Sequence, residues 1–199
     1  MEQKDEFLTI TDTPAEGFYS EKRSKFLAFA FHVTSEEEVK QYVAEFRKKY
    51  YDARHVCWAY MLGAERTDFR ANDDGEPSST AGKPILGQIN KNELTDILII
   101  VVRYYGGVNL GTSGLIVAYR TAAAEAIANA EIVSQFVEEE VVFDFPYIMM
   151  NYVMKIIKDM SPRIISQTYD NTCEMKLSIR KSEAPMLKAK FDKLAFKDD

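Results

Sequence analysis

The segment from Asp96 to Arg103 constrains the fold more than any other, because every residue between its two charged ends is apolar. A strand of this kind is buried on both faces, so we expect it near the centre of a sheet. A loop with four glycines follows, and the Ala-rich segment 112–130 predicts a closely packed helix. The chain is therefore built around a strand, a glycine-rich loop and a helix.

The remaining patterns predict a mixed α+β fold in two domains. Ahead of the central strand the expected elements are strands over 17–21 and 25–33, a helix from Ser35 to about Lys49, a strand over 53–62 and an irregular helix within 80–92. After residue 135 the order is strand, helix, strand, strand, helix, which is a ferredoxin-like order without its last strand. We expect an N-terminal domain over 1–135 and a C-terminal domain over 136–199.

Composition and charge exclude several classes of protein. The 199 residues carry 25 Lys and Arg against 31 Asp and Glu, and this net charge of −6 argues against a protein that coats DNA with a basic face. With 46% apolar residues the chain has enough core formers to fold. Cys57 and Cys173, far apart in sequence, indicate reduced thiols rather than a disulfide framework. The charged N-terminus and the short apolar runs predict a cytoplasmic protein without a membrane anchor.

Residues 72–84 form the first loop that could carry chemistry. Three carboxylates, three hydroxyl groups and two glycines fall within it. Carboxylates this close together can bind a hard cation or raise each other's pKa for acid–base catalysis. They can equally shape the start of a helix, with Ser79 or Thr80 as the cap. The calcium-loop pattern is not met, and we expect no metal and no cofactor.

Residues 101–114 form the second such loop. It joins the central strand, which ends in Arg103, to the following helix. Glycines let backbone N–H groups approach a ligand, a helix N-terminus attracts anions, and Arg103 is a forked donor, so a phosphate or carboxylate could bind here. The spacing matches neither a Walker loop nor a dinucleotide-binding motif. A tight connection between strand and helix explains the glycines equally well.

His55 and Cys57 lie on one face of the strand predicted over 53–62. Because residues i and i+2 of a strand are roughly 7 Å apart, they are too distant for a hydrogen-bonded nucleophile and base. Cys57 is more typical of a small buried apolar residue. For His55 a polar role in a site and a structural role remain open.

Four motifs together resemble the bacterial YigZ family, whose first domain is shared with the eukaryotic IMPACT proteins. The resemblance extends over nearly the whole chain, and its most specific string is Arg-aromatic-aromatic-Gly-Gly-x-x-Leu-Gly. The motifs are His55–Tyr60, Asp73–Pro77, Thr80–Leu86, and Val102–Gly107 with Leu110 and Gly111.

The resemblance implies an N-terminal domain like those of ribonuclease PH and a small-subunit ribosomal protein. It implies a C-terminal domain like the last domain of elongation factor G. IMPACT proteins restrain the starvation-responsive kinase that phosphorylates a translation initiation factor, by competing for its activator. No catalytic residues of the family can be carried over. The chain departs from the family at Ser79, Asn109 and Val117, where the family often has glycine, a basic residue, and a polar or basic residue.

Two hypotheses about function follow. The first is a non-catalytic, translation-linked regulatory protein that contacts RNA, the ribosome or a translation-related protein, with basic residues at 22–25 and 47–49 as RNA contacts. The second is an enzyme acting on a phosphorylated or carboxylated small molecule. In that case four residues should converge on one cleft: His55, Asp74, Glu76 and Arg103. The candidate ligand-binding residues are His55, Asp73, Asp74, Gly75, Glu76, Thr80, Gly82, Arg103, Tyr104, Gly106, Gly107 and Gly111.

Overall fold

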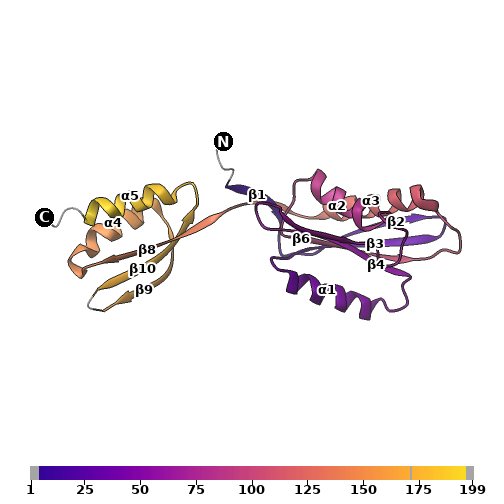
Figure 1. The fold of residues 1–199 in the computed structure, drawn as a ribbon, viewed down its shortest axis with the longest axis horizontal. Coiled ribbons are helices and arrows are strands. Elements are labelled where there is room, and N and C mark those ends of the chain that lie inside the picture. The colour runs from indigo at the N-terminus through magenta and orange to yellow at the C-terminus, as the bar shows by residue number, and fades with distance from the viewer. Residues whose placement is uncertain (1–4, 171, 196–199) are drawn as a thin grey trace. The chain divides into compact units, whose positions relative to one another are not determined.

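The chain folds into two compact units, drawn as a ribbon in Figure 1. The structure is a computed structural model that describes residues 5–170 and 172–195. The first unit consists of residues 7–135, and the second joins Asp5 and Glu6 to the described residues from Phe136 onward. The chain therefore passes from one unit to the other twice, near residue 6 and near residue 135.

A five-stranded antiparallel sheet forms the middle layer of the first unit, in the order β2-β3-β6-β4-β5. The apolar strand β6 is central, as predicted, and its residues Ile97 to Arg103 are all buried. The strands are β2 (Ala15–Glu21), β3 (Ser24–His32), β4 (His55–Leu62), β5 (Asp68–Asn72) and β6 (Ile97–Tyr104).

Three helices cover the two faces of this sheet (Figure 1). Helix α1 (Glu36–Lys49) packs on one face, with α2 (Gly82–Lys91) and α3 (Gly111–Asn129) on the other. The predicted start of α1 is confirmed, since the Ser35 side chain accepts a hydrogen bond from the Glu38 backbone N–H. The many small alanines of α3 let it pack closely on β2, β3 and β6.

The second unit has the predicted order of strand, helix, strand, strand, helix. Its three strands form an antiparallel sheet in the order β8-β10-β9, and both helices contribute to its apolar core. Its elements are β8 (Glu138–Phe145), the short 3-10 helix η1 (Tyr147–Met149), α4 (Met150–Met160), β9 (Arg163–Tyr169), β10 (Cys173–Arg180) and α5 (Ala184–Ala195).

Three strands were missed by the sequence patterns: β1 (Glu6–Ile10), β5 and β7 (Ile132–Phe136). Strand β1 pairs with β7 in a separate two-stranded sheet, and β5 forms an edge of the large sheet. The predicted helix within 80–92 is shorter and begins at Gly82. The mixed α+β fold is confirmed, whereas the likeness to ribonuclease PH, a ribosomal protein and elongation factor G stays a prediction. Within the described ranges, the helices are too short or too polar for one to span a bilayer.

Candidate functional site

A cleft of about 520 Å³ in the first unit joins the two loops singled out by the sequence. One wall comes from the acidic loop and the start of β4, and the other from the end of β6, the glycine-rich loop and the first turn of α3. The residues that line the cleft are Arg54, His55, Gly75, Glu76, Pro77, Arg103, Tyr105, Asn109, Leu110, Gly111, Thr112 and Leu115.

A buried ion pair lies at the base of this cleft. The Arg103 Nη1 donates to Glu76 Oε1 at 2.6 Å, and the two side chains are only 7% and 2% exposed. The Tyr119 hydroxyl of α3 donates to the same oxygen at 2.6 Å. Burial, with the nearby Cys57 and Glu76, raises the pKa of Tyr119, so its hydroxyl keeps its proton. Glu76 is thus held by two short hydrogen bonds.

His55 is oriented by the acidic loop. Its Nδ1 lies 2.7 Å from the Asp74 carbonyl oxygen, which can only accept, so Nδ1 carries the hydrogen of this bond. Its Nε2 lies 3.7 Å from Glu76 Oε2. The side chain is 15% exposed and lines the cleft. Of the three side chains next to the Glu76 carboxylate, His55 is therefore more exposed than Arg103 and Tyr119.

Asp73 serves the local structure of the loop. Its Oδ1 accepts from the backbone N–H groups of Ala81 and Gly82 at 3.1 and 2.8 Å, and its Oδ2 accepts from that of Ser79. Asp73 therefore satisfies the N-terminal donors of α2, a role that sequence reasoning gave to Ser79 or Thr80. The Thr80 hydroxyl instead donates back to the Pro77 carbonyl at 2.6 Å.

Asp74 ties the acidic loop to β4 and α1. Its Oδ2 accepts from the Val56 backbone N–H at 2.7 Å, and its Oδ1 pairs with Arg47 Nη2 at 2.8 Å. Arg47, considered above as an RNA contact, is thereby partly neutralised. Among the described residues, no group of three His, Cys, Asp or Glu side chains is placed to hold a metal ion.

The glycines of the second loop have different roles. A Cβ on Gly106 would lie 2.2 Å from the Arg23 carbonyl carbon, so close packing requires glycine there, and its N–H already donates to Ser24 Oγ. Gly111 has a φ of +70° and opens α3 at the cleft, where no side chain caps the helix and no acid occupies its first turn. Tight chain connection thus explains Gly106, while the start of α3 is open to an anion.

The structure brings some predicted site residues together and separates others. Five of the twelve line the cleft: His55, Gly75, Glu76, Arg103 and Gly111. Four lie in the loop behind it without lining it: Asp73, Asp74, Thr80 and Gly82. Tyr104, Gly106 and Gly107 do not line it either.

Sequence reasoning missed four polar residues of the cleft, which are Arg54, Tyr105, Asn109 and Thr112. The Arg54 N–H donates to the Arg103 carbonyl at 2.9 Å, which holds the two residues at one end of the sheet. The family motif offered a signal for Tyr105, since it is the second aromatic of the string. Cys57 is buried, and burial raises the pKa of its thiol, so the interpretation as an apolar core residue is confirmed.

Residues 22–127, which carry all of these cleft residues, match the model of the Impact N-terminal domain. The chain belongs to the IMPACT family. The resemblance noted from the motifs is therefore confirmed.

IMPACT relatives match over much of the chain. The IMPACT family member YigZ of Escherichia coli is 30% identical over 171 residues, which cover 85% of this chain and 84% of that protein. An IMPACT family member of Haemophilus influenzae is 33% identical over 79% of this chain and 78% of its own. Eukaryotic proteins named as IMPACT homologues also match. The crystal structure of a hypothetical protein is 27% identical and covers 98% of this chain and 96% of its own, with a TM-score of 0.75.

The IMPACT-domain cleft is suited chemically to holding an anion. Arg54 is exposed, Arg103 is balanced by Glu76, and the start of α3 adds a partial positive charge. In contrast, the carboxylates of Asp73, Asp74 and Glu76 all accept hydrogen bonds from the protein itself.

Proposed function

We propose that this IMPACT-family protein is a non-catalytic, translation-linked regulatory protein of the cytoplasm that contacts RNA, the ribosome or a translation-related protein. Membership of the family supports the link to translation. The two cysteines are free and buried, which supports a reducing compartment.

One observation carries the choice of binding over catalysis: the carboxylates of the acidic loop are used internally. A general base must reach the proton that it removes. Glu76, which would be the natural base, is 2% exposed, and its Oε1 already accepts from both Arg103 and Tyr119. The arrangement is therefore typical of a rigid recognition surface.

Cosedimentation with purified bacterial ribosomal subunits, and direct binding to ribosomal RNA over a series of KCl concentrations, tests this proposal. We expect binding that weakens as salt rises, because contacts to phosphates release counterions. Binding that is indifferent to salt would eliminate phosphate contacts and leave a protein partner. Failure to bind subunits, RNA and translation factors alike would overturn the proposal.

The second candidate is an enzyme for a phosphorylated or carboxylated small molecule. The observation in its favour is that His55, Glu76 and Arg103 do line one cleft, together with the open start of α3. Asp74, the fourth residue expected there, does not line it. Thermal unfolding in the presence of inorganic phosphate or succinate tests whether the cleft binds an anion. Arg54→Gln is the variant, because Arg54 lines the cleft without belonging to the buried ion pair. Equal unfolding temperatures with and without these anions would remove this candidate.

A further inference from the structure

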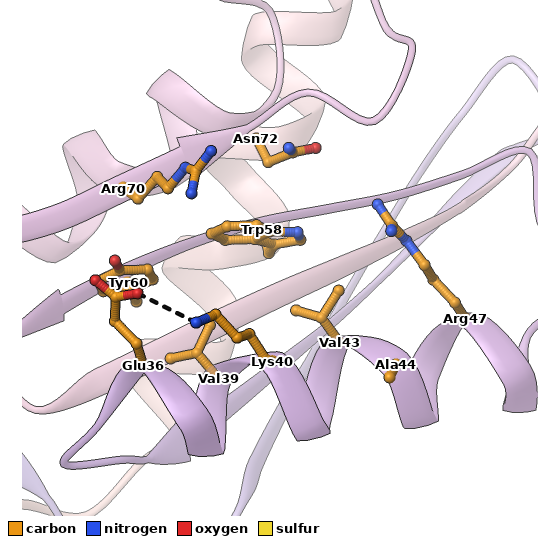
Figure 2. A pocket seen from close by; sticks show the side chains of 10 residues that line it. All are labelled: Glu36, Val39, Lys40, Val43, Ala44, Arg47, Trp58, Tyr60, Arg70 and Asn72. Atoms are coloured by element: carbon orange, nitrogen blue, oxygen red, sulfur yellow. Dashed lines mark ion pairs between the residues drawn. The ribbon is translucent and has the colours of Figure 1, made fainter.

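A second groove lies on the opposite face of the sheet, between α1 and the strands β4 and β5. Its volume is about 280 Å³, and Figure 2 shows its side chains. The groove exists because α1 alone packs on this face and leaves the side of β4 and β5 partly open. Its lining residues are Glu36, Val39, Lys40, Val43, Ala44, Arg47, Trp58, Tyr60, Arg70 and Asn72.

Two aromatic rings form the sheet side of this groove. Trp58 and Tyr60 lie on the same face of β4, with ring centroids 6.0 Å apart and planes only 10° from parallel. The sheet register sets Asn72 opposite Trp58 and Arg70 opposite Tyr60. Figure 2 shows Trp58 between Arg70 of β5 on one side and α1 on the other. Tyr60 is only 4% exposed and Trp58 is partly exposed, so the Trp58 ring is the one that a flat ligand can reach for stacking.

The indole N–H of Trp58 lacks an acceptor. Its Nε1 is buried and makes no hydrogen bond within the described part of the chain. Buried polar groups in proteins almost always have a partner, since an unsatisfied donor is costly. Burial raises the pKa of the neighbouring Tyr60 to about 12, so its hydroxyl remains a donor, here to Asp68. The indole N–H of Trp58 is therefore an unsatisfied donor that is closed off from solvent.

Positive charge surrounds the rings. Lys40 and Arg47 come from α1 and Arg70 comes from β5, whereas Glu36 is the one acidic residue of the lining. Lys40 pairs with Glu36 at 3.5 Å and Arg47 pairs with Asp74. Arg70 is exposed and has no ion pair or hydrogen bond among the described residues. Its charge is free to meet an anion at the edge of the aromatic platform.

We propose that this groove holds one unpaired nucleotide of a single-stranded RNA, with the base on the partly exposed Trp58 ring, beside the buried Tyr60, and a phosphate at Arg70. The inference rests on the proposed function and names RNA as its partner. A base is flat and can stack on an aromatic ring, and the nucleic-acid backbone carries the negative charge that would pair with Arg70. The volume lies just below the range of roughly 300–1,000 Å³ typical of drug-sized ligands, so it suits a single nucleotide.

Trp58 reports on the groove directly, because the chain contains a single tryptophan. Titration with a short oligouridylate should quench its emission, whereas double-stranded RNA, whose bases are already paired, should leave it unchanged. Trp58→Ala should weaken binding of the labelled oligouridylate about tenfold to a hundredfold, by fluorescence anisotropy. Trp58→Phe keeps an aromatic ring and should lose less affinity than Trp58→Ala. Arg70→Gln should lower the slope of log affinity against log salt by about 0.7.

Lys91→Gln is the matched control, because Lys91 is an exposed cation at the end of α2 on the other face of the sheet. Equal losses of oligouridylate affinity for Arg70→Gln and Lys91→Gln would mean that the RNA is attracted by the overall charge rather than bound at this groove, and would overturn the inference. Stronger quenching by an acidic peptide than by oligouridylate would also overturn it, in favour of a protein partner. If both Trp58 variants still bind ribosomal subunits and oligouridylate like the wild type, this inference fails while the proposed function stands.

Discussion

Removing the Glu76 carboxylate is expected to destabilise the first unit severely. In Glu76→Ala the guanidinium of Arg103, whose side chain is 7% exposed, loses its ion-pair partner, and the Tyr119 hydroxyl loses its acceptor. Breaking a buried ion pair from one side costs about 3–5 kcal/mol, because the remaining charge stays buried. Whole domains are stable by only about 5–15 kcal/mol, so this one change removes a large share of the free energy of unfolding.

Urea denaturation followed by Trp58 emission measures this loss, because the single tryptophan lies in the first unit. With a slope of about 1–3 kcal/mol per molar urea, the midpoint should fall by roughly 1–5 M. Replacing both partners, as Glu76→Leu with Arg103→Met, should cost less than Glu76→Ala, since no charge is left buried. A loss below about 1 kcal/mol, or a double variant less stable than Glu76→Ala, would refute the reasoning.

Three further predictions concern single positions. Gly106→Ala should lower the free energy of unfolding by about 1–3 kcal/mol in the same urea assay, because its Cβ meets backbone, whereas Gly87→Ala in α2, which meets nothing, should raise it by about 0.5–1 kcal/mol. Hydrogen bonds and charge from Arg180 hold the pKa of Asp5 well below its usual range, so the second unit should lose stability as the pH falls below about 4. In thermal unfolding followed by circular dichroism, Asp5→Asn should remove this loss of stability at low pH. An acid dependence equal to that of the wild type would contradict the prediction. Cys57 should resist iodoacetamide in the folded protein at pH 8, by mass spectrometry, and react only after unfolding.

The regular elements with strong periodicity were predictable from the sequence. The apolar strand β6, the capped helix α1 and the Ala-rich helix α3 each follow from a local pattern. Strands β1, β5 and β7 were not predictable in this way. Strand β5 is an exposed edge strand and carries little apolar alternation. Its pairing with β4 depends on tertiary contacts that no short window of sequence contains.

The two loops of the candidate site were predictable from the sequence, but the hydrogen bonds within them were not. Sequence patterns marked both loops, and Glu76 and Arg103 do meet, although 27 positions separate them. The patterns could not indicate that Asp73 satisfies the start of α2, because that role depends on how the loop folds back. The groove at Trp58 could not be predicted from the sequence either, because Arg70 is placed beside it only by the register of β4 with β5.

The double passage of the chain between its units has a consequence for synthesis. Asp5 accepts from Arg180, which lies 175 positions later, so the second unit needs two residues that are made far apart in time. At about 5–20 residues per second, Asp5 leaves the polymerising centre roughly 9–35 s before Arg180 is added. Residues 7–135 can finish folding in that interval. Loss of Asp5 would therefore affect the second unit, whose described residues from Phe136 onward are made after residues 7–135, and not the unit that follows Asp5 directly in the sequence.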